Sequence, residues 1–190
     1  MPTSTAWQRP APIWPRGQTA AEKRVDNLTK KAKGNDKDAR EQLDLVNRAL
    51  VLLREGKPAR FLERKPEEER AFNMLGLLTS KPVLYVCNVE EGSAKDGNGF
   101  SKQVFEHAKK EGAVAVVISA KIESEIATLS REERAEFLET LGLEEAGLDR
   151  LIRAGYQLLD LITYFTVGPK EARAWTIHRG TKGPAAAGVI

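Results

Sequence analysis

Two uninterrupted apolar runs lie in the middle of the chain, at residues 82–87 (PVLYVC) and 113–119 (AVAVVIS). Runs of this length that are rich in β-branched and aromatic residues are typical of strands buried on both faces of a sheet. Between them, residues 100–112 carry apolar positions at the spacing of an amphipathic helix. The order strand, helix, strand predicts a right-handed parallel β-α-β unit. The helix residues expected to face inward are Val104, Phe105 and Ala108.

The residues before this unit have the period of helices. A first helix is predicted over residues 20–34 and a second over residues 36–56, for which Asp36 or Asp38 can act as the N-cap. The short KGND connection predicts an antiparallel helical hairpin with a basic outer surface, a candidate coiled-coil arm. A third helix is predicted within residues 65–78. The apolar stripe of the second helix consists of Leu43, Val46, Leu50 and Leu53.

After the second apolar run, the pattern predicts two further helices and then a change of period. The helices correspond to residues 129–142 and 144–161, and Ser130 with Glu133 has the spacing of a capping box. Residues 161–178 then alternate with a period of two on either side of the turn GPKE. This alternation predicts a β-hairpin near the end of the chain.

The two ends of the chain show no regular period. Residues 1–19 contain four prolines and two tryptophans and are predicted to be an irregular lead-in, whereas residues 179–190 are predicted to be a loop. The lead-in lacks the apolar segment of a secretory signal. No apolar run reaches the about 18 residues that a membrane span requires. We therefore expect no membrane association.

The composition indicates a cellular compartment and shows where charge is concentrated along the chain. Cys87 is the single cysteine among 190 residues, so no disulfide framework exists and a reducing cytoplasm is expected. Its place in an apolar strand predicts a buried small side chain, with a redox sensor as the second interpretation. The net charge is +3, but residues 20–65 hold 13 Lys and Arg against 8 Asp and Glu. Such a region can bind a phosphate-rich partner or be an ordinary solvated helix face.

Polar residues follow both predicted strands directly. Residues 88–91 (NVEE) come after the first strand, and residues 119–121 (SAK) come at the end of the second. In an open parallel sheet, ligands bind beyond the carboxyl ends of the strands. An Asn offers a donor and an acceptor in one plane, a carboxylate accepts from base N–H groups, and the stem of a Lys can stack on a ring. The two turns predict a nucleotide-base pocket, with an ordinary strand-end turn as the alternative.

The NVEE turn and the segment from residue 118 onward resemble one protein family. The segment contains ISAKIESEIATLSREERAEFLETLG and TYFTVGPKEARAWTIHRGTK. With NVEE, it is similar to the YchF / Obg-like ATPase family, the redox-regulated ATPases of the TRAFAC GTPase class. The likeness covers approximately residues 20–190. In that family a Ras-like G domain carries an inserted coiled-coil arm and is followed by a TGS domain.

This resemblance implies the fold class and the domain organisation. The expected fold is α/β: a partial Ras-like G domain of parallel strands and flanking helices, with an inserted helical arm and the beginning of a β-rich TGS domain. The expected parts are an irregular lead-in over residues 1–19, the helical arm over residues 20–66, the C-terminal half of the G domain over residues 67–160 and the start of the TGS domain over residues 161–190.

The resemblance also implies which residues bind the base. The family has Asn-x-x-Glu where GTPases have Asn-Lys-x-Asp, and the NVEE turn matches it. The Ser-Ala-Lys turn resembles the second base-recognition element. In a GTPase the Asp accepts from guanine N1–H and the 2-amine, which adenine lacks, so its replacement agrees with a preference for ATP, with GTP as the other purine ligand. The implied base-binding residues are Asn88, Val89, Glu91, Ser119, Ala120 and Lys121.

One element of the family does not occur in the sequence. No G-x-x-x-x-G-K-[ST] is present, so no phosphate cradle and no hydroxyl for Mg²⁺ is expected. We therefore expect a fragment: the base-recognition half of a P-loop-type ATPase, with no catalytic residue, no metal ligand and negligible hydrolysis by itself. ATP with Mg²⁺ is the cofactor implied for the full-length family member. The alternative function is a ribosome- or RNA-associated binding module that uses the basic arm and the TGS domain.

Overall fold

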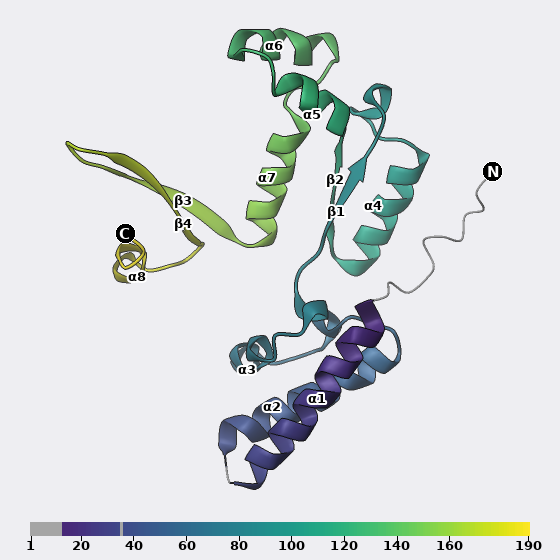
Figure 1. The fold of residues 1–190 in the computed structure, drawn as a ribbon, viewed down its shortest axis with the longest axis vertical. Helices are drawn as coiled ribbons and strands as arrows, with labels where there is room; N and C mark the ends of the chain where they lie inside the picture. Colours follow the sequence, from purple (N-terminus) through teal and green to yellow (C-terminus); the bar gives the residue numbers. More distant parts are fainter. Residues whose placement is uncertain (1–12, 35) are drawn as a thin grey trace. The chain divides into compact units, whose positions relative to one another are not determined.

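The computed structural model describes residues 13–34 and 36–190 (Figure 1). These residues form two compact units, one that ends at Pro82 and one that begins at Val83. The mixture of helices with a parallel strand pair confirms the predicted α/β class. None of the helices in the described part of the chain is both long and apolar enough to cross a membrane.

The first unit is built on a helical hairpin. Helix α1 (Ile13–Lys33) and helix α2 (Lys37–Arg54) pack along each other, as the sequence predicts (Figure 1). Asp36 is the N-cap of α2, because its carboxylate accepts a hydrogen bond from Ala39 N at 3.0 Å. The predicted stripe supplies much of the core. Val46, Leu50 and Leu53 of the stripe are buried, and Leu43 is partly buried. Leu45 and Ala49 of α2 and Ala21 of α1 are buried in the same core.

Helix α1 starts earlier than predicted. The sequence pattern predicts an irregular lead-in over residues 1–19, whereas α1 begins at Ile13. Irregular backbone is therefore the wrong prediction for residues 13–19. Pro15 falls in the first turn of the helix, where a backbone N–H has no intrahelical acceptor and a proline removes no helical hydrogen bond. The first twelve residues of the predicted lead-in lie outside the described residues.

The segment after α2 packs on the hairpin. It contains the short helix α3 (Glu69–Met74) and 3₁₀ turns at Ala59–Phe61, Pro66–Glu68 and Leu78–Ser80. Phe72, Leu75 and Leu77 are buried in the same core as α2. The first unit therefore extends past residue 66, at which the sequence places the end of the arm.

The second unit contains the predicted β-α-β arrangement. Strands β1 (Leu84–Asn88) and β2 (Val114–Ile118) are parallel, with Asn88 paired to Ile118 at their carboxyl ends. Helix α4 (Gly99–Glu111) connects them, and Gly112 ends it in the left-handed conformation (φ 64°). In Figure 1 the strand pair lies between α4 and α7 (Gly147–Leu158), and both helices contact both strands.

The side chains of the strand pair and of α4 are less buried than the sequence predicts. Ala108 of α4 is buried and Val104 is half-buried, but Phe105, predicted to face inward, is 42% exposed. Val86 of β1 is 45% exposed, so β1 is not buried on both faces. Neighbouring strands lie only about 4.8 Å apart, so two strands cover the central row of a helix face and leave its flanks uncovered. Among the described residues, β1 pairs with β2 alone.

Three helices surround the carboxyl ends of the strands. Helix α5 (Ala120–Ile126) was not predicted, whereas α6 (Arg131–Thr140) and α7 were. The predicted capping box opens α6: Ser130 Oγ accepts from Glu133 N, and the Glu133 carboxylate accepts from Ser130 N. The core that unites these helices is a small apolar cluster of Ala94, Ile122, Ile126, Leu138, Leu143 and Ala146.

The predicted β-hairpin follows α7. Strands β3 (Leu161–Val167) and β4 (Ala172–His178) are antiparallel, and Tyr164 pairs with Trp175. Trp175 Nε1 donates to Thr166 Oγ1 at 2.9 Å. The terminal residues form the short helix α8 (Gly183–Ala187) instead of a loop. The hairpin holds this helix, because the Tyr164 hydroxyl donates to Ala186 O at 2.7 Å.

Candidate functional site

The two turns predicted to form one site lie against each other at the carboxyl ends of β1 and β2. Asn88 Oδ1 accepts a hydrogen bond from Ala120 N at 2.9 Å. Val89 N donates to Ile118 O, also at 2.9 Å, and so continues the strand pairing by one bond. Parallel strands end at the same edge of a sheet, which is why residues more than thirty positions apart meet here.

A second interaction joins the same two turns. Lys121 Nζ lies 2.8 Å from Glu91 Oε2, and the hydrogen bond between them raises the pKa of the Lys121 ammonium. Both side chains are accessible, with 68% of Lys121 and 40% of Glu91 exposed. An exposed ion pair contributes little to stability. Its geometric effect is to place a cation and a carboxylate across the gap between the turns.

The Asn88 side chain is exposed and oriented. Because its Oδ1 accepts from Ala120 N, the Nδ2 group is turned away from that contact. Within the described part of the chain, Asn88 Nδ2 has no hydrogen-bond partner. The site therefore offers one free amide donor next to an acceptor that has a further lone pair.

The other predicted site residues differ in access. Val89 is half-buried, and Ala120 and Lys121 are exposed. Ser119 is only 2% exposed, and its Oγ has no hydrogen-bond partner among the residues described. The side chain of Ser119 thus lies beneath the turn, and a ligand that rests on the turn would contact its neighbours instead.

Glu90, the remaining residue of the NVEE turn, organises the loop that follows. Its carboxylate accepts hydrogen bonds from Ser93 Oγ and from Asn98 Nδ2, the latter at 3.1 Å, and these bonds lower the pKa of Glu90. Asn98 in turn caps α4 by accepting from Phe100 N and Ser101 N. Glu90 therefore connects the first turn to the start of α4.

A shared apolar core supports both turns from below. Ala94 follows Glu91 in the first turn, and Ile122 follows Lys121 in the second. Both are buried in the cluster that includes α6 and the start of α7. The positions of the polar residues at the rim are consequently fixed by packing as well as by hydrogen bonds.

The sequence pattern did not reveal the role of Glu123. It suggests only that Glu123 and Glu125 cap or solvate a helix. In the structure, Glu123 Oε1 accepts from Gly147 N at 2.7 Å, so Glu123 caps α7 rather than its own helix. Nothing in the spacing of 24 residues marks this pairing in advance.

Cys87 is half-buried in β1, and burial raises the pKa of its thiol above the usual value. A thiol with a raised pKa stays protonated at neutral pH and reacts slowly. Cys87 is thus half-buried and not buried as predicted, because β1 is open to solvent on one face, and its raised thiol pKa still agrees with a small apolar side chain.

The described residues contain no all-protein cluster of metal ligands. No group of three or more His, Cys, Asp and Glu side chains converges anywhere in residues 13–34 and 36–190. The two turns offer the Asn88 amide, the Lys121 ammonium and two carboxylates, of which Glu91 is paired with Lys121 and Glu90 is hydrogen-bonded to Ser93 and Asn98.

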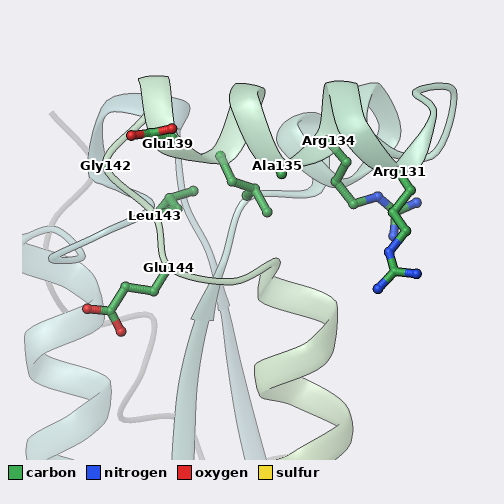
Figure 2. Close-up of a pocket in the computed structure, with 8 residues that line it drawn as sticks. Arg131, Arg134, Ala135, Glu139, Gly142, Leu143 and Glu144 are labelled. Atoms are coloured by element: carbon green, nitrogen blue, oxygen red, sulfur yellow. The ribbon is translucent and has the colours of Figure 1, made fainter.

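A separate hollow lies on α6 and the loop that follows it (Figure 2). Figure 2 shows Arg131 and Arg134 toward one end, with Glu139 and Glu144 toward the other. None of the predicted base-binding residues lines it. The lining consists of Arg131, Arg134, Ala135, Leu138, Glu139, Gly142, Leu143 and Glu144.

The fold and the paired turns define a class of protein, an α/β protein of the G-domain type. The solved structure of the Schizosaccharomyces pombe YchF GTPase matches with a TM-score of 0.79 and 28% identity, over 93% of this chain and 49% of that chain. The family model YchF-GTPase_C, described as a protein of unknown function (DUF933), matches residues 161–190.

Curated relatives give the same assignment. The ribosome-binding ATPase YchF of Bacillus subtilis (strain 168) is 47% identical over 171 residues, and that of Escherichia coli O157:H7 is 48% identical over 169 residues. The chain belongs to the YchF family. Each match covers 89% of this chain, which spans about half the length of these relatives: 47% of the first and 46% of the second.

Proposed function

We propose that the turns after β1 and β2 bind the adenine base of ATP and that Asn88 reads the edge of the base. The observation that carries this proposal is the hydrogen bond from Ala120 N to Asn88 Oδ1. It fixes the plane of the amide and turns Nδ2 toward the exposed rim. A preorganised donor next to an acceptor is what recognition of a flat ligand requires.

The chemistry of the amide suits adenine. Adenine presents the acceptor N7 beside the N6 amine, and an Asn side chain can donate to the one and accept from the other. Oδ1 has two lone pairs, so it can accept from the amine while it keeps the bond from Ala120 N. Guanine presents O6 in place of the amine, and O6 would face Oδ1 without a proton between them. Asn88 is therefore expected to favour ATP, with GTP as the weaker ligand through N7.

The ion pair favours the same ligand. A site selective for guanine needs a carboxylate that accepts from N1–H and the 2-amine. Glu91 has a longer side chain than the Asp of a GTPase, and one of its oxygens is already bound to Lys121 at 2.8 Å. The stem of Lys121 and the side chain of Val89 then provide apolar surface beside the base.

The rest of the ATPase reaction is proposed for the whole protein and not for this chain by itself. The sequence contains no G-x-x-x-x-G-K-[ST] to hold the triphosphate, and no group of three or more metal-ligating side chains converges among its described residues. ATP with Mg²⁺ is accordingly the cofactor of a longer family member that supplies those groups. We expect the isolated chain to bind ATP weakly and to hydrolyse it at a negligible rate.

A second candidate function is binding to ribosomes or other RNA in the cytoplasm, in agreement with the names of the bacterial relatives. The observation that favours it is the basic end of the helical hairpin. Lys30, Lys31 and Lys33 in the last turn of α1 are exposed, as is Lys37 at the start of α2. Clustered exposed cations attract phosphate backbones without needing a shaped pocket.

Saturation-transfer NMR of ATP at millimolar concentration tests the nucleotide proposal. The adenine H8 and H2 signals should receive saturation from the wild-type chain, and Asn88→Ala should abolish the effect. Gln103→Ala is the matched control, because it removes an exposed amide from α4 of the same unit. Equal transfer to ATP from wild type and Asn88→Ala, or none from either, would refute base recognition by Asn88.

A further inference from the structure

The start of α7 is capped by a residue from another helix. The N-cap residue of α7, Ala146, has no side chain that can accept a hydrogen bond. Gly147 N donates instead to Glu123 Oε1 of α5 at 2.7 Å. A carboxylate at this place satisfies one of the free N–H groups of the first turn and complements the positive end of the helix dipole.

The fit around this contact is close. A Cβ atom at Gly147 would lie 2.9 Å from Glu123 Oε1 and 3.2 Å from both Cβ and Cγ2 of Ile118. Ile118 is the last residue of β2. A Cβ at this position would displace the Glu123 carboxylate and push Ile118 by a few tenths of an ångström, so the glycine lets the first turn of α7 approach both without such shifts. The contact is therefore part of the packing and not a loose surface bond.

Glu123 lies one helical turn from the candidate base site. Its own N–H donates to Ser119 O at 3.0 Å, and the neighbouring Ile122 is 1% exposed in the apolar cluster. The segment from Ser119 to Glu123 is thus anchored twice. Asn88 holds its first part through Ala120 N, and α7 holds its last part through Glu123.

We propose that Glu123 is a positioning residue for base recognition. By fixing α5 to the start of α7, it holds the Ala120 N–H against Asn88 and keeps Lys121 within reach of Glu91. This inference rests on the proposed function of the two turns. This role differs from a contribution to stability alone, because Glu123 keeps the turn at residues 119–121 ordered.

The test compares Glu123→Ala with Glu123→Gln, which retains an acceptor for Gly147 N. Glu136→Ala on the neighbouring helix α6 is the charge control, since it removes an exposed carboxylate that has no side-chain hydrogen bond or ion pair with any described residue. Leu138→Ala removes a side chain from the same apolar cluster. It serves as the comparison variant for a general loss of stability. Hydrogen exchange at the Ala120 amide and the affinity for ADP are measured well below the melting temperature.

Glu123→Ala should speed exchange at the Ala120 amide and weaken ADP binding, each by about tenfold, the value of one hydrogen bond to a charged group. Glu123→Gln should restore most of both, the charge control should change neither, and Leu138→Ala should speed exchange and weaken binding less than Glu123→Ala does. The inference is overturned if exchange at Ala120 in Glu123→Ala matches that in Leu138→Ala. If the wild type binds no nucleotide, the proposed function fails, whereas exchange at Ala120 still decides the positioning role.

Discussion

The side-chain oxygen of Asn88 accepts a hydrogen bond from the backbone N–H of Ala120, 2.9 Å away. The two residues come from different turns, one after each strand of the parallel pair. Their bond makes a single surface of the two turns and gives the Asn88 amide one orientation. A flat ligand at this edge would meet the free Nδ2 group first, which is the physical basis of the adenine proposal.

The ion pair between Lys121 and Glu91 predicts a change in base preference. Lys121→Met keeps an unbranched apolar stem but removes the ammonium, so the Glu91 carboxylate becomes free to accept from guanine N1–H. The ratio of GTP affinity to ATP affinity should rise by about tenfold, as expected for one hydrogen bond to a charged group. Competition binding with the two nucleotides measures the ratio. In the double variant Lys121→Met with Glu91→Ala, which has no acceptor for N1–H, the gain should disappear, and a gain that persists there would contradict the account.

Truncating Phe72 or Phe105 to alanine should lower the free energy of unfolding by different amounts. Phe72 is 1% exposed in the core of the first unit, so Phe72→Ala should lower the free energy of unfolding by about 3–5 kcal/mol. Phe105 is 42% exposed on α4, so Phe105→Ala should cost about 1 kcal/mol or less. Chemical denaturation followed by circular dichroism measures both. Similar losses for the two variants would show that Phe105 is buried in solution.

The basic end of the helical hairpin predicts salt-sensitive RNA binding. Replacing Lys30, Lys31 and Lys33 together by Ala should weaken co-sedimentation with ribosomes. It should also reduce the slope of log affinity against log salt by about 0.7–0.9 for each phosphate that the lysines no longer neutralise. The matched triple variant Lys102→Ala, Lys109→Ala, Lys110→Ala removes equal charge from exposed positions of α4. If both triple variants weaken binding equally, net charge and not the hairpin is responsible.

The elements with a strong period could be predicted from the sequence. The two apolar runs predicted the parallel pair, and the stripe from Leu43 to Leu53 predicted α2. Topology then placed residues 88–91 beside residues 119–121, because parallel strands end at one edge. The meeting of Asn88 with the Ser-Ala-Lys turn thus followed from strand order alone.

The features that were missed depend on partners far away in the chain. Helices α5 and α8 have seven and five residues, which is too short to display a helical period. Phe105 is exposed because the sheet has only two strands among the described residues, and the apolar pattern of α4 does not reveal the width of the sheet. The bond from Gly147 to Glu123 joins two helices whose packing no local pattern encodes. Burial of Ser119 likewise reflects the packing of its turn.

The most direct test of the central claim is a titration of ATP into the ¹⁵N-labelled chain and into its Asn88→Asp variant. Aspartate keeps the acceptor for Ala120 N but has no donor for the base. In the wild type, ATP should shift the amides of Val89 and Ala120 in a saturable way, and GTP should shift them less. In Asn88→Asp these shifts should vanish while the Ala120 amide stays protected from exchange. Undiminished ATP shifts at Val89 and Ala120 in Asn88→Asp would contradict base recognition by the Asn88 amide.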